Sequence, residues 1–118
     1  MAEFALIERL RQRAQATSLA RDDVALGIGD DAALIDPPPG QQLVIAVDTL
    51  VDGVHFPRGT RAFDIGWKAL AVNLSDLAAM GATPAAALLA LTLPNDDADF
   101  VDGFIDGFAA LADAHGVA

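Results

Sequence analysis

Three short acidic segments stand out in the sequence because their residue types can hold a cation or a phosphorylated ligand. In residues 27–31, two glycines precede the adjacent carboxylates of Asp30 and Asp31. Glycine lets the backbone approach a ligand closely, and adjacent carboxylates repel each other unless a cation or a hydrogen-bond donor lies nearby. A simple Gly-Asp turn between two strands is the alternative interpretation of this segment.

The second segment, residues 48–56, directly follows a run of five apolar residues, 43–47. An aspartate at the end of a strand is well placed to face a ligand, which makes Asp48 a candidate binding residue with Thr49 and His55 as nearby hydrogen-bonding groups. A capped turn explains the same residues equally well. A single histidine is more often structural than catalytic, so His55 alone carries little weight.

The third segment, residues 70–80, belongs to a predicted helix that is apolar on nearly every side, which is typical of a buried helix. Asp76 is the only charged residue between Lys68 and Asp96. A buried ionised carboxylate without a partner is too costly to persist, so this position predicts a nearby metal, cation or proton. Asn73 lies one turn earlier on the same face, so the two side chains can converge on one site. The alternative is a hydrogen bond from a neighbouring backbone N–H to Asp76.

The charge balance restricts the classes of partner. Fifteen Asp and two Glu stand against six Arg and one Lys, the net charge is −10, and no basic residue follows Lys68. An acidic surface repels phosphate backbones and anionic lipids, so nucleic acid and membrane surfaces are poor partners, and a phosphorylated ligand requires divalent cations. Most of the aspartates fit turns, helix caps and solvated faces.

Several familiar arrangements are absent from the sequence. It has no cysteine, no signal-peptide pattern at its start and no apolar run near the roughly 20 residues of a membrane span, so the cytoplasm is the expected compartment. The P-loop pattern is missing, and the Asp-rich stretch 96–103 lacks the EF-hand order because its glycine is out of place.

Hydrophobic patterning predicts the elements that carry these segments. Helical spacing of apolar residues predicts an amphipathic helix over 3–16. The apolar runs 32–35 and 43–47 flank a proline-rich break at 37–40 and predict two strands of a hairpin. A helix over 62–80 follows, with Gly81 at its C-terminal cap.

The last third of the chain predicts a strand over the apolar residues 85–93 and then a helix that is capped by Asn95 or Asp96, runs to about Ala114 and stops at Gly116. The element order is therefore α-β-β-α-β-α. The three final residues read as the start of another strand, so we expect the chain to be part of a longer protein. A hydrophobic fraction of 53% supports a globular domain.

Taken together and in order, residues 27–33, 48–56 and 68–82 resemble the thiamine-monophosphate kinase family in both content and spacing. The resemblance extends over essentially the whole chain and includes residues 91–94. The wider superfamily contains aminoimidazole ribonucleotide synthetase, selenophosphate synthetase and the hydrogenase maturation dehydratase, and it shares the Asp and Asn-Asp positions. The ending of the second motif, residues 54–56, points to the thiamine branch.

This resemblance implies an α+β fold for residues 1–118, like the N-terminal domain of aminoimidazole ribonucleotide synthetase. That domain has a mixed sheet with helices on one face, and it pairs with its twin to form a β-barrel in a homodimer. The family also has an ATP-cradling C-terminal domain, which this chain lacks, so the chain alone is expected to be inactive. A dimerisation module, or another ATP-dependent synthetase of the superfamily, is the alternative.

The resemblance further implies Mg²⁺ and ATP as cofactor and co-substrate, and thiamine monophosphate as the acceptor. The implied metal ligands are Asp31, Asp48 and Asp76. The implied helpers in cofactor binding are Asp30, Thr49 and Asn73. His55 would contact thiamine monophosphate. The family transfers the γ-phosphoryl group in line, a reaction in which positioning and charge neutralisation matter more than a base, so no catalytic base is assigned.

One position departs from the family pattern. Many relatives have a hydroxyl residue immediately before the strand-end aspartate, whereas this chain has Val47. A metal contact at Val47 is therefore restricted to its backbone carbonyl.

Overall fold

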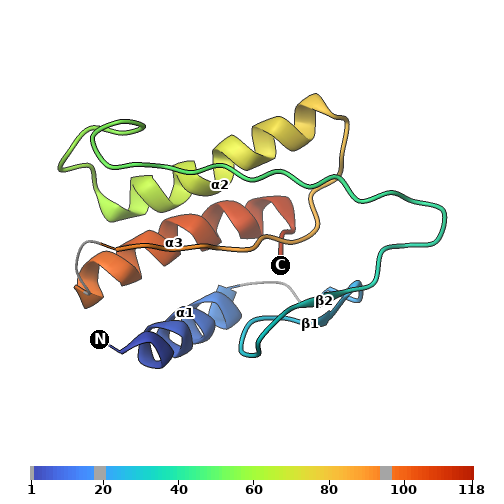
Figure 1. Ribbon diagram of the computed structural model, residues 1–118, viewed down its shortest axis with the longest axis horizontal. Helices are drawn as coiled ribbons and strands as arrows, with labels where there is room; N and C mark the ends of the chain where they lie inside the picture. The colour runs from blue at the N-terminus through green and yellow to red at the C-terminus, as the bar shows by residue number, and fades with distance from the viewer. Residues whose placement is uncertain (1, 18–20, 94–96) are drawn as a thin grey trace.

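The computed structural model describes residues 2–17, 21–93 and 97–118, which form three α-helices and one small sheet (Figure 1). The helices and strands are α1 (Glu3–Thr17), β1 (Val24–Leu26), β2 (Leu34–Ile35), α2 (Ala62–Ala79) and α3 (Ala98–His115). This is the predicted α+β composition, and the three predicted helices are confirmed. None of the helices in the described residues has the length and hydropathy to cross a membrane.

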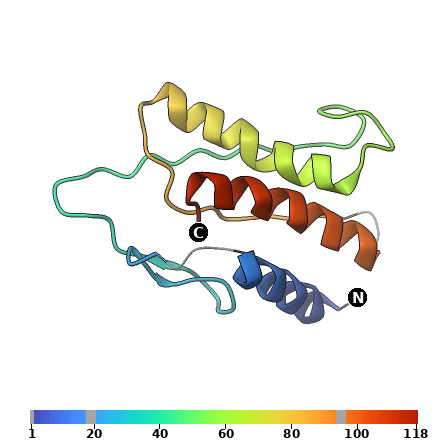
Figure 2. The ribbon, with the colours of Figure 1, turned by 180° about the vertical axis from the view of Figure 1, so that it is seen from behind.

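Helix α3 is the centre of the domain and lies between α1 and α2, as the views from the front and from behind show (Figures 1 and 2). The buried side chains form two clusters on opposite sides of α3. The α2 side contains Leu70, Leu111, Ala112 and Val117. The α1 side contains Leu10, Val101 and Ile105. The apolar faces of the three helices therefore supply the core.

The backbones of α2 and α3 are in direct contact at two glycines. A Cβ atom at Gly107 would lie 1.9 Å from the carbonyl oxygen of Phe63, and one at Gly66 would lie 1.9 Å from the carbonyl oxygen of Phe104. Both distances are far shorter than any van der Waals contact, so this crossing requires glycine on both helices.

The helix ends follow the sequence signals closely but not completely. Gly81 and Gly116 follow α2 and α3 with φ angles of 67° and 66°, in the left-handed region that favours glycine, as predicted. The cap of α3 is Asp97, whose side chain accepts a hydrogen bond from the N–H of Asp99 at 3.0 Å. The prediction of Asn95 or Asp96 as the cap was therefore wrong; both residues lie outside the described part of the chain.

The sheet differs most from the prediction. Strand β2 falls within the predicted strand 32–35, but it pairs antiparallel with β1 and not with residues 43–47, in the register Val24↔Ile35 and Leu26↔Leu34. The hairpin prediction was wrong because no strand was expected at β1. In the described residues the sheet has these two strands, so the expected mixed sheet is not formed within the chain.

The apolar segments 43–47 and 85–93 are extended but form no strand. An isolated extended segment needs a neighbour to complete its backbone hydrogen bonds. Within residues 85–93, Ala87 donates to the carbonyl of Ala118 at 2.9 Å, and the N–H of Ala118 donates to the carbonyl of Ala85 at 3.0 Å. These two bonds have the parallel pattern, so the end of the chain does lie against a neighbouring segment as a strand would.

Candidate functional site

The Asp30–Asp31 motif lies in the turn that connects β1 to β2. Gly29 has a φ of 125°, a conformation that favours glycine, and the N–H of Asp31 donates to Oδ1 of Asp30 at 2.8 Å. Both aspartates are exposed. The turn therefore presents two carboxylates to solvent, and one of them is already oriented by the backbone.

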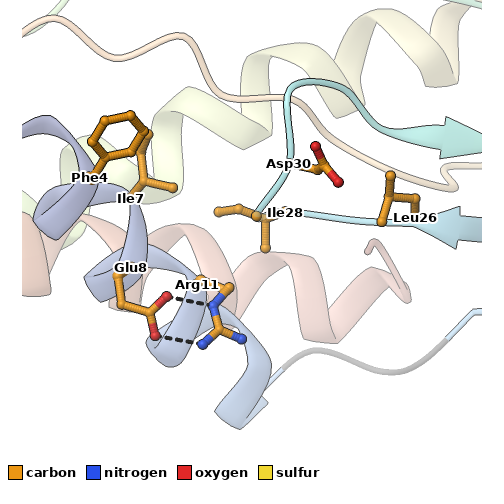
Figure 3. Close-up of a pocket in the computed structure, with 8 residues that line it drawn as sticks. Phe4, Ile7, Glu8, Arg11, Leu26, Ile28 and Asp30 are labelled. Atoms are coloured by element: carbon orange, nitrogen blue, oxygen red, sulfur yellow. Dashed lines mark hydrogen bonds and ion pairs between the residues drawn. The ribbon is translucent and has the colours of Figure 1, made fainter.

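A shallow depression of about 460 Å³ separates this turn from α1 (Figure 3). It is lined by Phe4, Ile7, Glu8, Arg11, Leu26, Ile28, Gly29 and Asp30. The Arg11 guanidinium binds Glu8 through two hydrogen bonds of 2.8 and 2.5 Å. These bonds lower the pKa of Glu8 to about 2, so Glu8 is ionised at neutral pH.

Asp48 and Thr49 lie in the extended segment before α2, and both are exposed. The preceding Val47 is also exposed, at 85% of its maximum. Residues 43–47 were expected to form a strand that presents Asp48 at its carboxyl end, but they form none, so the position of Asp48 depends on an extended segment that is not hydrogen-bonded to any described strand.

His55 lies in a tight turn, residues 51–56, which is held by hydrogen bonds between its own residues. Gly53, with a φ of 75°, donates its N–H to the carbonyl of Phe56 at 2.9 Å, and the N–H groups of Val54 and His55 both donate to the carbonyl of Val51. The N–H of Val51 donates in turn to Nδ1 of His55 at 2.8 Å. Because Nδ1 accepts, the proton of the neutral ring is on Nε2, and the exposed ring offers an N–H donor to solvent.

Asn73 and Asp76 differ in their surroundings. The side-chain amide of Asn73 donates to the carbonyl of Ala69 at 2.9 Å, but its Oδ1 is buried and has no hydrogen-bond partner. A buried unsatisfied acceptor is costly, so Oδ1 is suited to bind a donor or a cation. Asp76 is exposed, so the expectation of a buried carboxylate was wrong for this chain.

The exposure of Asp76 has a simple structural cause. Helix α2 is buried only where it meets α3, at Ile65, Gly66 and Leu70. Ala71 and Leu74 are partly buried against the same core, whereas Trp67 is 42% exposed and Met80, which follows the helix, is 70% exposed. An apolar composition therefore did not make α2 a buried helix, because other elements of this chain cover only one of its sides.

The predicted metal ligands come from three separate segments: the β1–β2 turn, the extended segment and α2. Within the described residues, no three His, Cys, Asp or Glu side chains gather into a group able to hold a metal ion. The side chains of Asp31, Asp48 and Asp76 also make no hydrogen bond or ion pair with a described residue. They are therefore available as ligands but are not assembled into a site.

A second set of acidic residues serves a structural purpose that the sequence analysis missed. Arg9 binds Asp102 through two hydrogen bonds of 2.6 Å, and Arg13 binds Asp106 at 3.0 and 2.5 Å. The Arg9 hydrogen bond lowers the pKa of Asp102, which keeps that carboxylate ionised. The sequence did carry a signal for these ion pairs. Arg9 and Arg13 are four residues apart, as are Asp102 and Asp106, so the two arginines share one helical face and the two aspartates share another.

Arg21 also serves the fold. It binds Asp23 at 2.9 and 2.8 Å and the backbone carbonyl of Gly116 at 2.7 Å. The segment before β1 is thereby tied to the C-terminal cap of α3. Arg61 pairs with Asp64 on the first turn of α2. Several aspartates thus form ion pairs with arginine, whereas the three predicted metal ligands form none with a described residue.

Known proteins resemble this chain along nearly its whole length. The thiamine-monophosphate kinase of Escherichia coli (strain K12) is 53% identical over 109 residues, and that of Salmonella typhimurium (strain LT2) is 51% identical over 109 residues; each match covers 92% of this chain. The chain spans 33% of the length of each of these relatives.

A solved structure shares both the fold and the sequence. The crystal structure of thiamine-monophosphate kinase from Stenotrophomonas maltophilia K279a matches with a TM-score of 0.82 and 62% identity, and the match covers 100% of this chain and 36% of that one. Residues 29–118 also match the family described as AIR synthase related protein, N-terminal domain. Since this match includes most of its residues, the chain belongs to the family of AIR synthase related proteins, as an N-terminal domain.

Proposed function

We propose that this chain is the N-terminal part of a thiamine-monophosphate kinase, which transfers the γ-phosphoryl group of ATP to thiamine monophosphate and so forms thiamine diphosphate. The observation that carries the proposal is the 62% identity to the Stenotrophomonas kinase, together with the shared fold, over the whole chain. The matched region includes all three acidic motifs, so the similarity is not confined to the hydrophobic core.

Magnesium is the cation that the donor set fits. Asp31, Asp48 and Asp76 offer hard carboxylate oxygens that no described arginine neutralises, and Mg²⁺ prefers such oxygens. These three residues would hold the metal, which supplies neutralisation of phosphate charge during the transfer. Since they are not assembled in the chain alone, we propose that binding of metal and nucleotide brings them together.

The remaining polar groups fit supporting roles. Oδ1 of Asn73 is buried and lacks a hydrogen-bond partner, so it can accept a hydrogen bond from a donor or face a cation one helical turn from Asp76. Asp30 directly precedes the proposed ligand Asp31, Thr49 directly follows the proposed ligand Asp48, and both residues are exposed. We assign these three residues to the nucleotide and its metal.

We assign His55 to thiamine monophosphate. Its Nδ1 is occupied by the Val51 N–H, so the ring presents an Nε2–H donor that can bind an anionic phosphate oxygen. This contact would position the acceptor without moving a proton, as expected for a reaction that depends on alignment of the two phosphates.

The exposed apolar segments support a homodimer. Ile45, Val47 and Leu88 are 81%, 85% and 85% exposed. Residues 43–47 have no strand partner among the described residues, and residues 85–93 are bonded only to the end of the chain, at Ala85 and Ala87. Unpaired apolar segments of this kind are completed by strands from another subunit, as in a sheet that closes into a barrel between two copies. We therefore propose that the barrel of the family forms between two copies of this domain.

The test of the proposal is a transfer assay with the complete protein, Mg²⁺ and γ-labelled ATP. Label is expected to appear in thiamine diphosphate when thiamine monophosphate is the acceptor, and not when unphosphorylated thiamine replaces it. A complete protein that dimerises but transfers no label would favour the dimerisation module. ATP turnover that depends on a different acceptor would favour another synthetase of the superfamily.

A further inference from the structure

The turn that carries His55 has one hydrogen-bonded connection to a helix. Apart from this connection, the hydrogen bonds described for residues 51–60 begin and end within that range. The exception is the side-chain ammonium of Lys68, which donates to the backbone carbonyl of His55. Lys68 is the single lysine of the chain and lies on the second turn of α2.

The bond from Lys68 is linked to the imidazole of His55 by the hydrogen bonds within the turn. The carbonyl held by Lys68 belongs to the residue whose N–H donates to Val51, and the Val51 N–H orients the ring through Nδ1. Fixing this carbonyl on α2 therefore holds the turn in place, and the turn held in this way keeps the Val51 bond that decides which ring nitrogen carries the proton. Both conditions are needed before Nε2–H can meet a ligand at a defined place.

The lysine has no competing partner that would explain its presence. It is exposed, and within the described residues its ammonium makes no ion pair with a carboxylate, although the chain is strongly acidic. A lysine that is present only for solubility would gain nothing by ordering its side chain against a backbone carbonyl. The bond therefore has the geometry of a tether between α2 and the turn that carries His55.

We propose that Lys68 is a positioning residue that holds His55 in place for the phosphate of thiamine monophosphate. This inference rests on the proposed function. It is specific to the acceptor side of the reaction, because the Lys68 bond reaches the His55 turn and none of the three proposed metal ligands.

The test is a double-mutant cycle in the complete protein. Lys68→Met is expected to lower kcat/KM for thiamine monophosphate about fivefold, the size of one exposed hydrogen bond, and to leave the KM for ATP unchanged. In the His55→Ala background the same substitution should have no further effect, since Lys68 would act only through His55. Lys68→Arg keeps a cationic donor and should restore most of the loss.

Arg61→Gln is the matched control. It removes one positive charge at the start of the same helix, where Arg61 pairs with Asp64 and has no described hydrogen bond to the turn, so the acceptor KM should not change. Equal losses from Lys68→Met with and without His55 would overturn the proposal. A rise in the KM for ATP alone would overturn it as well, because it would make Lys68 a phosphate-binding cation.

A spectroscopic measurement separates positioning from loss of structure. In protein with ¹⁵N-labelled histidine, His55 should give the shifts of a ring with its proton on Nε2, and Lys68→Met should move both ring nitrogens toward the average of two tautomers. The His55→Ala variant assigns the signals, and His115 on α3 serves as the internal reference. Unchanged His55 shifts in Lys68→Met would refute the tether. If the unmodified protein transfers no label to thiamine monophosphate while these shifts do respond, the proposed function fails and the tether stands.

Discussion

Replacing Gly107 with alanine tests whether the close contact between α2 and α3 holds the domain together. The added methyl group would start 1.9 Å from the Phe63 carbonyl oxygen, which is backbone and cannot rotate away as a side chain would. The two helices must therefore separate by more than an ångström at this point. Their separation loosens the cluster around Leu70 and Leu111, which the same crossing brings together.

Two opposing effects set the size of the change. Alanine in a helix interior is favoured over glycine by about 1 kcal/mol. Overpacking a tight core costs about 1–3 kcal/mol and occasionally more, and a clash with backbone belongs at the upper end of that range. The net loss in the free energy of unfolding is therefore about 2 kcal/mol, which lowers the folded-to-unfolded ratio about 30-fold.

The assay is denaturant unfolding of the complete protein, with Gly103→Ala as the matched control on the same helix. A Cβ at Gly103 would lie 3.1 Å from the Cβ of Ala62, a contact that a shift of a few tenths of an ångström relieves. Gly103→Ala should therefore change the denaturation midpoint little, while Gly107→Ala should lower it clearly. A Gly107→Ala protein as stable as the Gly103→Ala protein would refute the close backbone contact.

Four further outcomes are expected. Asp76→Asn should preserve the fold and any dimer but reduce phosphoryl transfer about 100-fold or more in a Mg²⁺-dependent assay, because the amide binds the metal poorly; near-normal turnover would exclude Asp76 as a ligand. His55→Ala should raise the Michaelis constant for thiamine monophosphate and leave that for ATP unchanged, and the reverse result would place His55 on the wrong substrate. Asp102 has a lowered pKa in the folded state, so its contribution to stability is complete above about pH 4 and is lost as the pH falls through the lower folded pKa. In Asp102→Asn, the free energy of unfolding should therefore fall less on acidification than it does in the unmodified protein. Light scattering of the protein should show self-association, and a strict monomer from micromolar to millimolar concentration would contradict the dimer.

The helices could be predicted from sequence because their signals are local. The amphipathic spacing of Phe4, Ile7 and Leu10, and the glycines at 81 and 116, place the helices and their C-terminal ends within one or two residues of the structure. The error at the start of α3 is of the same kind, since 95–97 offers three successive candidates for one cap, and neighbouring residues decide among them.

The strand pairing could not be predicted because pairing is not local. Residues 43–47 have the composition of a strand, yet they have no strand partner among the described residues, whereas the inconspicuous Val24–Leu26 pairs with Leu34–Ile35. A strand is defined by its neighbour, and a neighbour outside these 118 residues leaves no trace in them.

The three motifs predict Asp31, Asp48, His55 and Asp76 as candidate site residues, but the sequence did not indicate how they are arranged. The structure shows them exposed on separate segments. Burial of Asp76 was inferred from the composition of α2, but burial depends on what packs against a helix as well as on its own residues. The Lys68 bond to the His55 carbonyl has no sequence signature at all, because it joins a side chain to backbone.

The ion pairs of α1 have a consequence for the order in which the domain opens. Arg9 and Asp102 are 93 residues apart, and α1 reaches α3 only after this long loop has closed, whereas α2 and α3 are near neighbours along the chain. We therefore expect α2 and α3 to form the slowest-exchanging unit in hydrogen exchange, with α1 opening as a separate unit at lower free energy. The rim of the depression beside Asp30 is formed partly by α1, so opening of α1 would widen that surface without unfolding α2, the helix that carries Asn73 and Asp76.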